Sequence, residues 1–305
     1  MLLLAPRKVT GSSLFHRSLS KSITSFSKDE ALKRRQEELM RRGLPKRKTI
    51  EGVKHVLLVS SGKGGVGKST VAVNLSVALS KLSPSHKVAL LDADIFGPSV
   101  PIMMNISEPP LLDGKNKMLP VQNHGVGCIS IGLLIDSSSA AVWRGPMVMG
   151  AINKLIFDTN WTGTDFLIVD LPPGTGDIHL SLSQTVEVSG AVVVTTPQRV
   201  AMADVRKGVD MFNKVDVPVL GVLENMSGFV CNNCQEINHI FGSDGAQNLA
   251  DSLNVPLLGK IPLDPAITSS SDTGKPLVIS HPNSKSAKLY LNVAQSIVSK
   301  LTKIQ

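Results

Sequence analysis

Cysteine is scarce in this chain, with three residues in 305, and this scarcity excludes one class of protein. A small secreted domain stapled by disulfide bonds needs several pairs of cysteines, which this sequence does not supply. Cys128 lies within the largely apolar run 126–131, so we expect it to be a buried core thiol. Cys231 and Cys234 form a close pair that needs a separate explanation.

Long hydrophobic runs are also absent. No run approaches the ~20 apolar residues of a membrane-spanning helix, so at most we expect peripheral association with a membrane. The N-terminus has no continuous apolar segment followed by a small-residue cleavage site, as a secretory signal would have. A chain of 305 residues is long enough to bury one large core.

The net charge of +8 comes from one end of the chain. Residues 1–54 contain 14 of the 32 lysines and arginines but only 5 of the 24 acidic residues, so the rest of the chain is close to neutral. A nucleic-acid-binding domain carries basic residues over its folded surface. We therefore expect a basic tail on a near-neutral body, and no nucleic-acid partner.

The first 28 residues contain five basic residues, no acidic residue and nine serines and threonines, with apolar residues interspersed. This composition is typical of a mitochondrial transit peptide, and we expect the protein in the mitochondrial matrix. A disordered basic tail is the alternative. Residues 29–54 are predicted to form a charged helix that ends near Gly43 and Pro45, followed by a basic linker.

The most specific motif is a glycine-rich loop between an apolar run at 55–60, predicted as a strand, and a segment with helical apolar spacing at 71–82. Glycines let successive backbone N–H groups turn toward a phosphate, and a helix N-terminus adds partial positive charge. We predict a phosphate-binding loop for ATP rather than an ordinary glycine-rich turn. Lys68 would contact the β- and γ-phosphates, and the Ser69 hydroxyl would bind Mg²⁺. The motif consists of Gly62, Lys63, Gly64, Gly65, Val66, Gly67, Lys68, Ser69 and Thr70.

Lys63 directly follows the first glycine of this loop. A lysine at that position is not needed for the phosphate cage of its own chain. Its side chain could instead extend to a nucleotide held by a facing subunit. The sequence therefore predicts a homodimer with ATP sandwiched between the two chains.

Acidic residues follow two further apolar runs. Asp92 and Asp94 come after the run 87–91, and Asp170 ends the run 166–170. Parallel α/β sheets place ligands at the carboxyl ends of their strands, so we expect these acids to orient water or to receive the water shell of Mg²⁺. Helix capping is the alternative for the first pair. Gly174, in the loop after Asp170, would let a backbone N–H approach the γ-phosphate and withdraw after hydrolysis.

Apolar runs at 191–195 and 217–223, separated by a helix-like segment at 202–214, continue the alternation. This pattern predicts an α/β fold, with a mostly parallel, doubly wound sheet and helices on both faces. We expect residues 55–305 to form one P-loop NTPase domain, whose phosphate-binding loop is a deviant Walker A motif. Residues 224–227 are predicted to close the last strand. Asn225 would be placed to contact an adenine edge, although a turn asparagine is the simpler interpretation.

Cys231 and Cys234 lie in a polar stretch, and their spacing lets both thiolates bind one soft metal centre. Tetrahedral zinc or a four-iron cluster needs four ligands, so a facing subunit is the natural source of the other two. Three alternatives remain: a redox dithiol, a zinc site completed by His239, and incidental surface thiols.

Several stretches together resemble the Mrp/ApbC family of P-loop iron–sulfur carrier ATPases. They are GKGGVGKST, the two acids before GPSVP, WRGPM, VDLPPGTGD, ENMSGFVCNNC and HIFG, and the resemblance runs from about residue 50 to the C-terminus. The resemblance implies a labile [4Fe–4S] cluster held between two subunits, slow ATP hydrolysis that serves as a switch, and delivery of the cluster to recipient apoproteins, in particular subunits of respiratory complex I.

The same resemblance assigns roles to residues. Lys63 would be the signature lysine, Lys68 the phosphate-binding lysine, Asp92 and Asp94 the switch I acids, and Asp170 the Walker B acid. Cys231 and Cys234 would be the cluster ligands. Many members have proline and glycine where Asn232 and Gln235 stand here, a departure that concerns the rigidity of the loop and the lifetime of the cluster.

Two other functions fit parts of the sequence. A partitioning or positioning ATPase that acts at a membrane or DNA surface is favoured by an apolar stripe with several lysines at 286–304, although a packed terminal helix also explains that stripe. A zinc-bridged structural dimer with vestigial hydrolysis is the other. The thiol pair distinguishes the cluster carrier from a positioning ATPase, which does not need it.

Overall fold

Short apolar strands, buried on both faces, form the centre of the structure, as parallel sheets require. The computed structural model describes residues 47–134, 145–231 and 233–304. The predicted transit peptide at 1–28 and the predicted charged helix after it lie outside the described residues. The elements are β1 (Val53–Ser61), α2 (Lys68–Leu82), β2 (Val88–Asp92), α3 (Val100–Met103), β3 (Val121–Asn123), β4 (Val126–Ser130), a 3₁₀ turn (Ile131–Leu133), α4 (Gly145–Phe157), β5 (Thr164–Asp170), α5 (Asp177–Thr185), β6 (Gly190–Thr195), α6 (Arg199–Lys214), β7 (Val219–Val230), β8 (Ile237–Asn238), α7 (Gly245–Ser252), β9 (Leu257–Leu263), α8 (Pro265–Asp272), α9 (Leu277–Ser280) and α10 (Lys285–Ile304).

Within the described residues the strands form one sheet in the order β3-β4-β2-β5-β1-β6-β7-β8, and β9 also pairs with β7. The pairings from β4 to β7, and of β7 with β9, are parallel, whereas β3 and β8 pair antiparallel with their neighbours. The predicted mostly parallel α/β sheet is confirmed.

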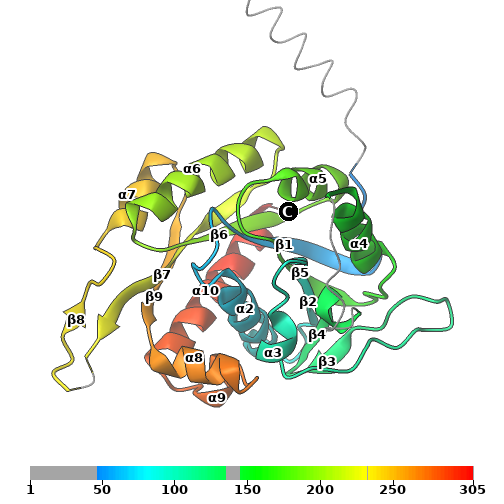
Figure 1. Ribbon diagram of the computed structural model, residues 1–305, viewed down its shortest axis with the longest axis horizontal. Coiled ribbons are helices and arrows are strands. Elements are labelled where there is room, and N and C mark those ends of the chain that lie inside the picture. The colour runs from blue at the N-terminus through cyan, green and yellow to red at the C-terminus, as the bar shows by residue number, and fades with distance from the viewer. Residues whose placement is uncertain (1–46, 135–144, 232, 305) are drawn as a thin grey trace, which may run out of the picture. The chain divides into compact units, whose positions relative to one another are not determined.

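Helices cover both faces of this sheet (Figure 1). On one face, α2, α3, α9 and α10 bury an apolar cluster against the strands. On the other face, α4, α5, α6 and α7 bury a second cluster. The cover on both faces confirms the doubly wound arrangement, and it explains why the middle residues of the central strands are apolar.

The order of the strands brings the predicted acids together. Strand β5 lies between β2 and β1, and Asp170 pairs in register with Asp92 on one side and with Val59 on the other. All three strands run parallel, so their carboxyl ends meet at one edge of the sheet. The glycine-rich loop leaves β1 at the same edge.

Strand β7 is longer than predicted. The sequence placed the end of this strand at residue 223 and a closing segment at 224–227, which is wrong because the strand runs to Val230. Pairing with β9 carries it past Asn225, and antiparallel pairing with β8 extends its end. Met226 has a positive φ of 55°, where the register with β9 shifts.

Helix α10 packs its apolar face against α2 and β9. Val293, Ile297 and Leu301 are buried there, which confirms a packed terminal helix. Among the described helices, none has the combination of length and apolar character needed to cross a membrane.

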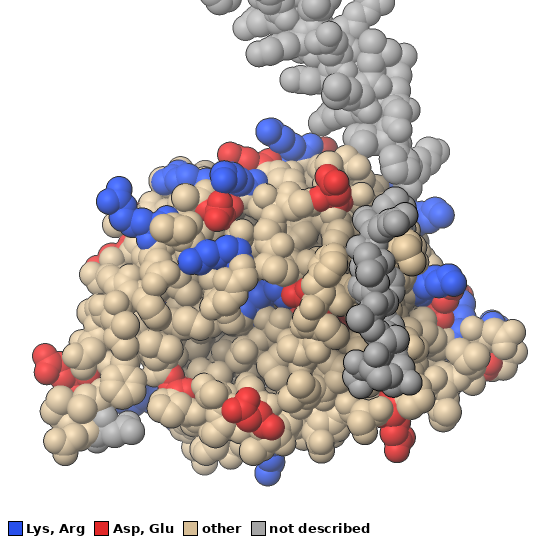
Figure 2. All heavy atoms as spheres, viewed as in Figure 1, with Lys and Arg blue, Asp and Glu red and all other residues tan. Residues whose placement is uncertain are grey.

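Charged side chains of both signs are interspersed on the face shown in Figure 2. Several of the described acidic and basic residues pair directly, such as Lys260 with Asp244 at 3.0 Å and Lys207 with Asp204 at 3.0 Å. The described residues on this face therefore form no extended surface of one sign.

Gly221 lies where β6, β7 and β9 meet, and it provides a test of this packing. Its φ is +157°, and a Cβ added there would lie 2.5 Å from the Pro256 carbonyl oxygen and 2.7 Å from Leu258 Cγ. We predict that Gly221→Ala lowers the free energy of unfolding by about 2 kcal/mol, because the backbone contact cannot relax. Urea denaturation followed by circular dichroism measures this change.

Gly150→Ala is the matched control for that substitution. Gly150 is exposed in the middle of α4, and a Cβ there meets nothing within 4 Å. Alanine should stabilise the helix by about 0.5–1 kcal/mol. Equal effects of the two substitutions would contradict the described packing of β7.

Candidate functional site

The glycine-rich loop joins β1 to α2 as predicted, and its last glycine shows why the sequence needs glycine there. Gly67 precedes α2 with φ 79° and ψ 26°, in the left-handed region that disfavours residues with a Cβ. A Cβ at this position would also collide with the side-chain amide of Asn225. The N-terminus of a fifteen-residue helix therefore opens directly onto the loop, which suits an anion.

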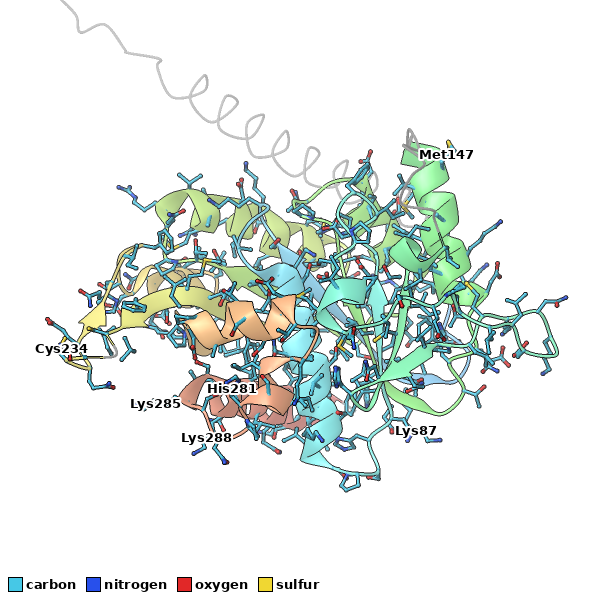
Figure 3. All side chains as sticks on the ribbon, turned by 60° about the horizontal axis from the view of Figure 1, so that its bottom comes forward. Lys87, Met147, Cys234, His281, Lys285 and Lys288 are labelled. Atoms are coloured by element: carbon cyan, nitrogen blue, oxygen red, sulfur yellow. The ribbon has the colours of Figure 1, made fainter. Side chains whose placement is uncertain are left out.

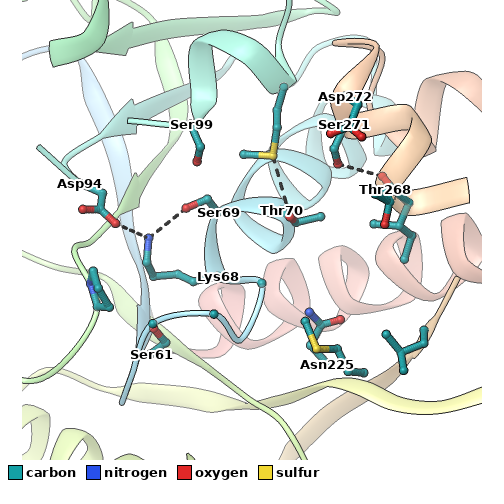
Figure 4. A pocket seen from close by; sticks show the side chains of 18 of the residues that line it. Ser61, Lys68, Ser69, Thr70, Asp94, Ser99, Asn225, Thr268, Ser271 and Asp272 are labelled. Atoms are coloured by element: carbon teal, nitrogen blue, oxygen red, sulfur yellow. Dashed lines mark hydrogen bonds and ion pairs between the residues drawn. The ribbon is translucent and has the colours of Figure 1, made fainter. Parts of the chain in front are cut away.

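Lys68 is the buried cation of the site, with 6% of its surface exposed. Its ammonium lies 2.6 Å from Asp170 Oδ1 and 3.6 Å from Asp94 Oδ2. The ammonium also lies 3.1 Å from Ser69 Oγ (Figure 4). One ammonium thus contacts two carboxylates, one just after β2 and one at the end of β5.

The two predicted switch I acids have different surroundings. Asp94 lines the cavity beside Lys68. Asp92 is fully buried: its carboxylate accepts hydrogen bonds from the backbone N–H groups of Asp94 and Val100 and from the Ser130 hydroxyl. Burial raises the pKa of Asp92 to about 7, and the charge of Asp170 adds to the increase. Asp92 therefore holds the following loop, and Asp94 faces the space where a ligand would sit.

Asp170 combines complete burial with an unused acceptor. Burial raises the pKa of its carboxyl group, while the charge of Lys68 opposes that shift. Its Oδ2 atom has no hydrogen-bond partner among the described residues. A buried carboxylate oxygen without a partner is costly unless a ligand completes it, and oxygen is the donor that Mg²⁺ prefers. The residues present therefore fit a magnesium ion with its water shell.

A cavity of about 540 Å³ extends from this loop. This volume suits a nucleotide. One wall is formed by the loop and by Asp94, and the far wall by Pro262, Leu263 and α8, with Thr268, Ser271 and Asp272 (Figure 4). We did not predict the far wall from the sequence. A signal for this wall is present in the sequence, where apolar residues at the start of β9 are followed by Pro262, Asp264 and Pro265. Asp264 caps α8, because its side chain accepts a hydrogen bond from the Ala266 N–H.

Three further predicted residues lie around the loop. The Lys63 ammonium lies 3.5 Å from Oε1, the side-chain amide oxygen of Gln198, and the Lys63 side chain is half-buried. The Gly174 N–H donates to the Ser61 carbonyl at 2.9 Å. The Asn225 amide nitrogen donates to the Val66 carbonyl at 2.9 Å, so this nitrogen supports the loop from β7. The adenine contact of Asn225 stays a prediction.

The two paired cysteines lie at the tip of the hairpin formed by β7 and β8. The Cys231 N–H donates to the Glu236 carbonyl at 2.9 Å, and the Gln235 N–H donates to the Cys231 carbonyl at 2.9 Å. Cys231 is half-buried and Cys234 is exposed at an outer edge of the described fold (Figure 3). The N–H of Cys234, followed by that of Asn233, lowers the pKa of the Cys231 thiol. A turn that favours the thiolate suits a soft metal centre.

The hairpin offers two thiols to a metal, those of Cys231 and Cys234. Among the described residues, no group of three or more His, Cys, Asp or Glu side chains is placed to hold a metal ion. His239 Nδ1 instead lies 3.3 Å from the Ser227 carbonyl oxygen, so the zinc site with His239 is not formed. Cys128 is fully buried in β4, as predicted, and burial raises the pKa of its thiol.

The chain is similar to known proteins over most of its length. It is 51% identical over 275 residues to the mouse "Iron-sulfur cluster transfer protein NUBPL", with 90% of this chain and 86% of the relative covered. It is 50% identical over 256 residues to the Arabidopsis thaliana "Iron-sulfur protein required for NADH dehydrogenase, mitochondrial", covering 84% and 82%.

A solved structure also matches. It is a nucleotide-binding protein from Archaeoglobus fulgidus in complex with ADP, with a TM-score of 0.65, 35% identity, and coverage of 74% of this chain and 88% of that one. Residues 52–298 match the ParA-group family described as the NUBPL iron-transfer P-loop NTPase. The match contains the glycine-rich loop, the acids and the thiol hairpin. The chain belongs to the family of NUBPL iron-transfer P-loop NTPases.

Proposed function

We propose that this protein is an ATP-dependent carrier that binds an iron–sulfur cluster and delivers it to mitochondrial apoproteins. The main observation behind the proposal is that β7 connects the nucleotide cavity to the paired cysteines. This strand contributes Asn225 to the nucleotide cavity and ends one residue before Cys231 at the tip of the hairpin. The names of the mouse and Arabidopsis relatives, which refer to iron–sulfur transfer and to NADH dehydrogenase, support the cargo and its destination.

The nucleotide would be ATP with Mg²⁺. Lys68 would leave Asp170 for the β- and γ-phosphates, and the Ser69 hydroxyl would bind the ion. Asp94 and the unpartnered Oδ2 of Asp170 would receive its water shell. Bound Mg²⁺ supplies charge neutralisation at the phosphates. Slow hydrolysis would act as a switch between states of the carrier.

The cluster site would be completed by a second copy of the chain. A [4Fe–4S] cluster needs four ligands, and the hairpin offers Cys231 and Cys234. Two hairpins that face each other supply four thiolates. The same homodimer would let Lys63 exchange its contact with Gln198 for the nucleotide of the facing subunit.

The recipients would be subunits of respiratory complex I, and the compartment the mitochondrial matrix. The Arabidopsis relative is named as required for the mitochondrial NADH dehydrogenase, which supports this destination. The basic, hydroxyl-rich composition of residues 1–28 supports import into the organelle.

The structure does not favour the alternative of a positioning ATPase at a membrane, because the apolar stripe that suggested it is buried. The apolar stripe of the C-terminal helix is buried against α2 and β9. A buried stripe is not available to insert into a lipid surface. The thiol hairpin has no role in that alternative.

The first test removes the thiols. We predict that Cys231→Ala with Cys234→Ala abolishes iron retention after anaerobic reconstitution, because the described residues contain no group of three or more His, Cys, Asp or Glu side chains that could hold the iron instead. ATP affinity should stay within about twofold, since neither cysteine lines the cavity. Iron and sulfide analysis and fluorescent-nucleotide titration measure the two properties. Cys128→Ala, which removes a buried thiol, should retain iron, and undiminished iron in the double variant would count decisively against the proposal.

The second test concerns Lys63, which would contact the nucleotide of the facing subunit. We predict that Lys63→Ala lowers the rate of ATP hydrolysis by about tenfold or more, while the Kd for ATP changes by less than about threefold, because its target is the partner's phosphate. Phosphate release and equilibrium titration measure the two. Lys207→Ala, at an exposed lysine of α6, is the control. Normal hydrolysis by the Lys63 variant would rule out the sandwiched dimer.

A further inference from the structure

The loop between β5 and α5 follows Asp170 directly and is fixed to β1 by two backbone hydrogen bonds. The Leu171 N–H donates to the Val59 carbonyl at 3.1 Å, and the Gly174 N–H donates to the Ser61 carbonyl at 2.9 Å. Pro172 lies between these two points. Because proline has no N–H, its carbonyl is its only backbone polar group.

His179 provides the partner for that carbonyl. The histidine lies in the first turn of α5 and is 1% exposed. Its Nε2 lies 2.7 Å from the Pro172 carbonyl oxygen, and its Nδ1 lies 3.5 Å from Ser60 Oγ. A carbonyl oxygen only accepts hydrogen bonds, so Nε2 carries the proton. Burial lowers the pKa of His179, so the ring stays neutral and its Nδ1 is an acceptor for the Ser60 hydroxyl.

The contact divides the loop into two parts. Leu171 and Pro172 are buried, whereas Pro173 and Gly176 are exposed and the two residues between them are half-buried. Without His179, the carbonyl of the buried Pro172 would lose the one hydrogen-bond partner that the described residues provide for it. The imidazole therefore marks the boundary between the part of the loop that is packed on β1 and the part that faces solvent.

The geometry points to His179 as a positioning residue for ATP hydrolysis: it holds Pro172 against β1, so that the rearrangement of the loop is confined to residues 173–176. This inference rests on the proposed ATPase. His179 does not line the nucleotide cavity, and it acts through the loop that carries Gly174. When the Gly174 N–H leaves Ser61 for a phosphate, the anchored Pro172 keeps Asp170 and the strand end in place.

Two substitutions of similar polarity test the role. In His179→Gln the side-chain amide nitrogen takes the place of Nε2 and can still donate to the Pro172 carbonyl. In His179→Asn the amide nitrogen takes the place of Nδ1, and the shorter side chain does not reach Pro172. We expect the asparagine variant to lower kcat for ATP hydrolysis about tenfold with KM for ATP within about twofold, and the glutamine variant to stay within about threefold of wild type. His281→Asn, at an exposed histidine outside the site, should leave kcat unchanged.

Amide hydrogen exchange provides a readout that does not need hydrolysis. In the nucleotide-free full-length chain, exchange at Gly174, Thr175 and Gly176 should be faster in the asparagine variant and close to wild type in the glutamine variant. Equal exchange and equal kcat in the two variants, whether both normal or both impaired, would overturn the inference. Absence of hydrolysis by the wild-type protein would instead refute the proposed function, and the exchange comparison would still decide the role of His179.

Discussion

The site depends on one buried ammonium. Asp92, Asp94 and Asp170 come together because β2 and β5 are adjacent parallel strands, and Lys68 is the cation that contacts two of these acids. Buried carboxylates without such a partner would cost several kcal/mol each. In the proposed cycle, phosphates take over Lys68 and Mg²⁺ takes over the carboxylates. Lys68 and the two carboxylates that it contacts would therefore each have a partner of opposite charge both with and without nucleotide.

The second constraint is the length of β7. Its middle supports the phosphate-binding loop through the hydrogen bond from Asn225 to Val66. Cys231 follows six residues after Asn225, which corresponds to at most about 20 Å of extended chain. Strand β7 therefore connects the nucleotide site to the thiol hairpin. The hairpin offers two thiols, and no group of three or more metal-binding side chains lies among the described residues, which is why we propose that a second copy of the chain completes the cluster site.

Local patterns predicted most of this architecture. The glycine-rich loop, the acids after 87–91 and 166–169, and the alternation of strands and helices depend on short-range spacing, and the sheet places them as expected. Long-range pairing explains what was missed. The sequence could not show that β9 extends β7 past Asn225, that α8 forms the far wall of the cavity, or that Asp92 turns inward to Ser130 while Asp94 faces the cavity. Likewise, nothing local marks His179, because its partner Pro172 lies across a loop.

We propose above all that two chains share one cluster through their thiol hairpins. Native mass spectrometry of the anaerobically reconstituted full-length chain tests it most directly, since it weighs protein, iron and sulfide in one particle. The account predicts a species of two chains with one [4Fe–4S] cluster, which separates into single chains when the cluster is removed in the absence of nucleotide. A single chain that retains a complete cluster would contradict it.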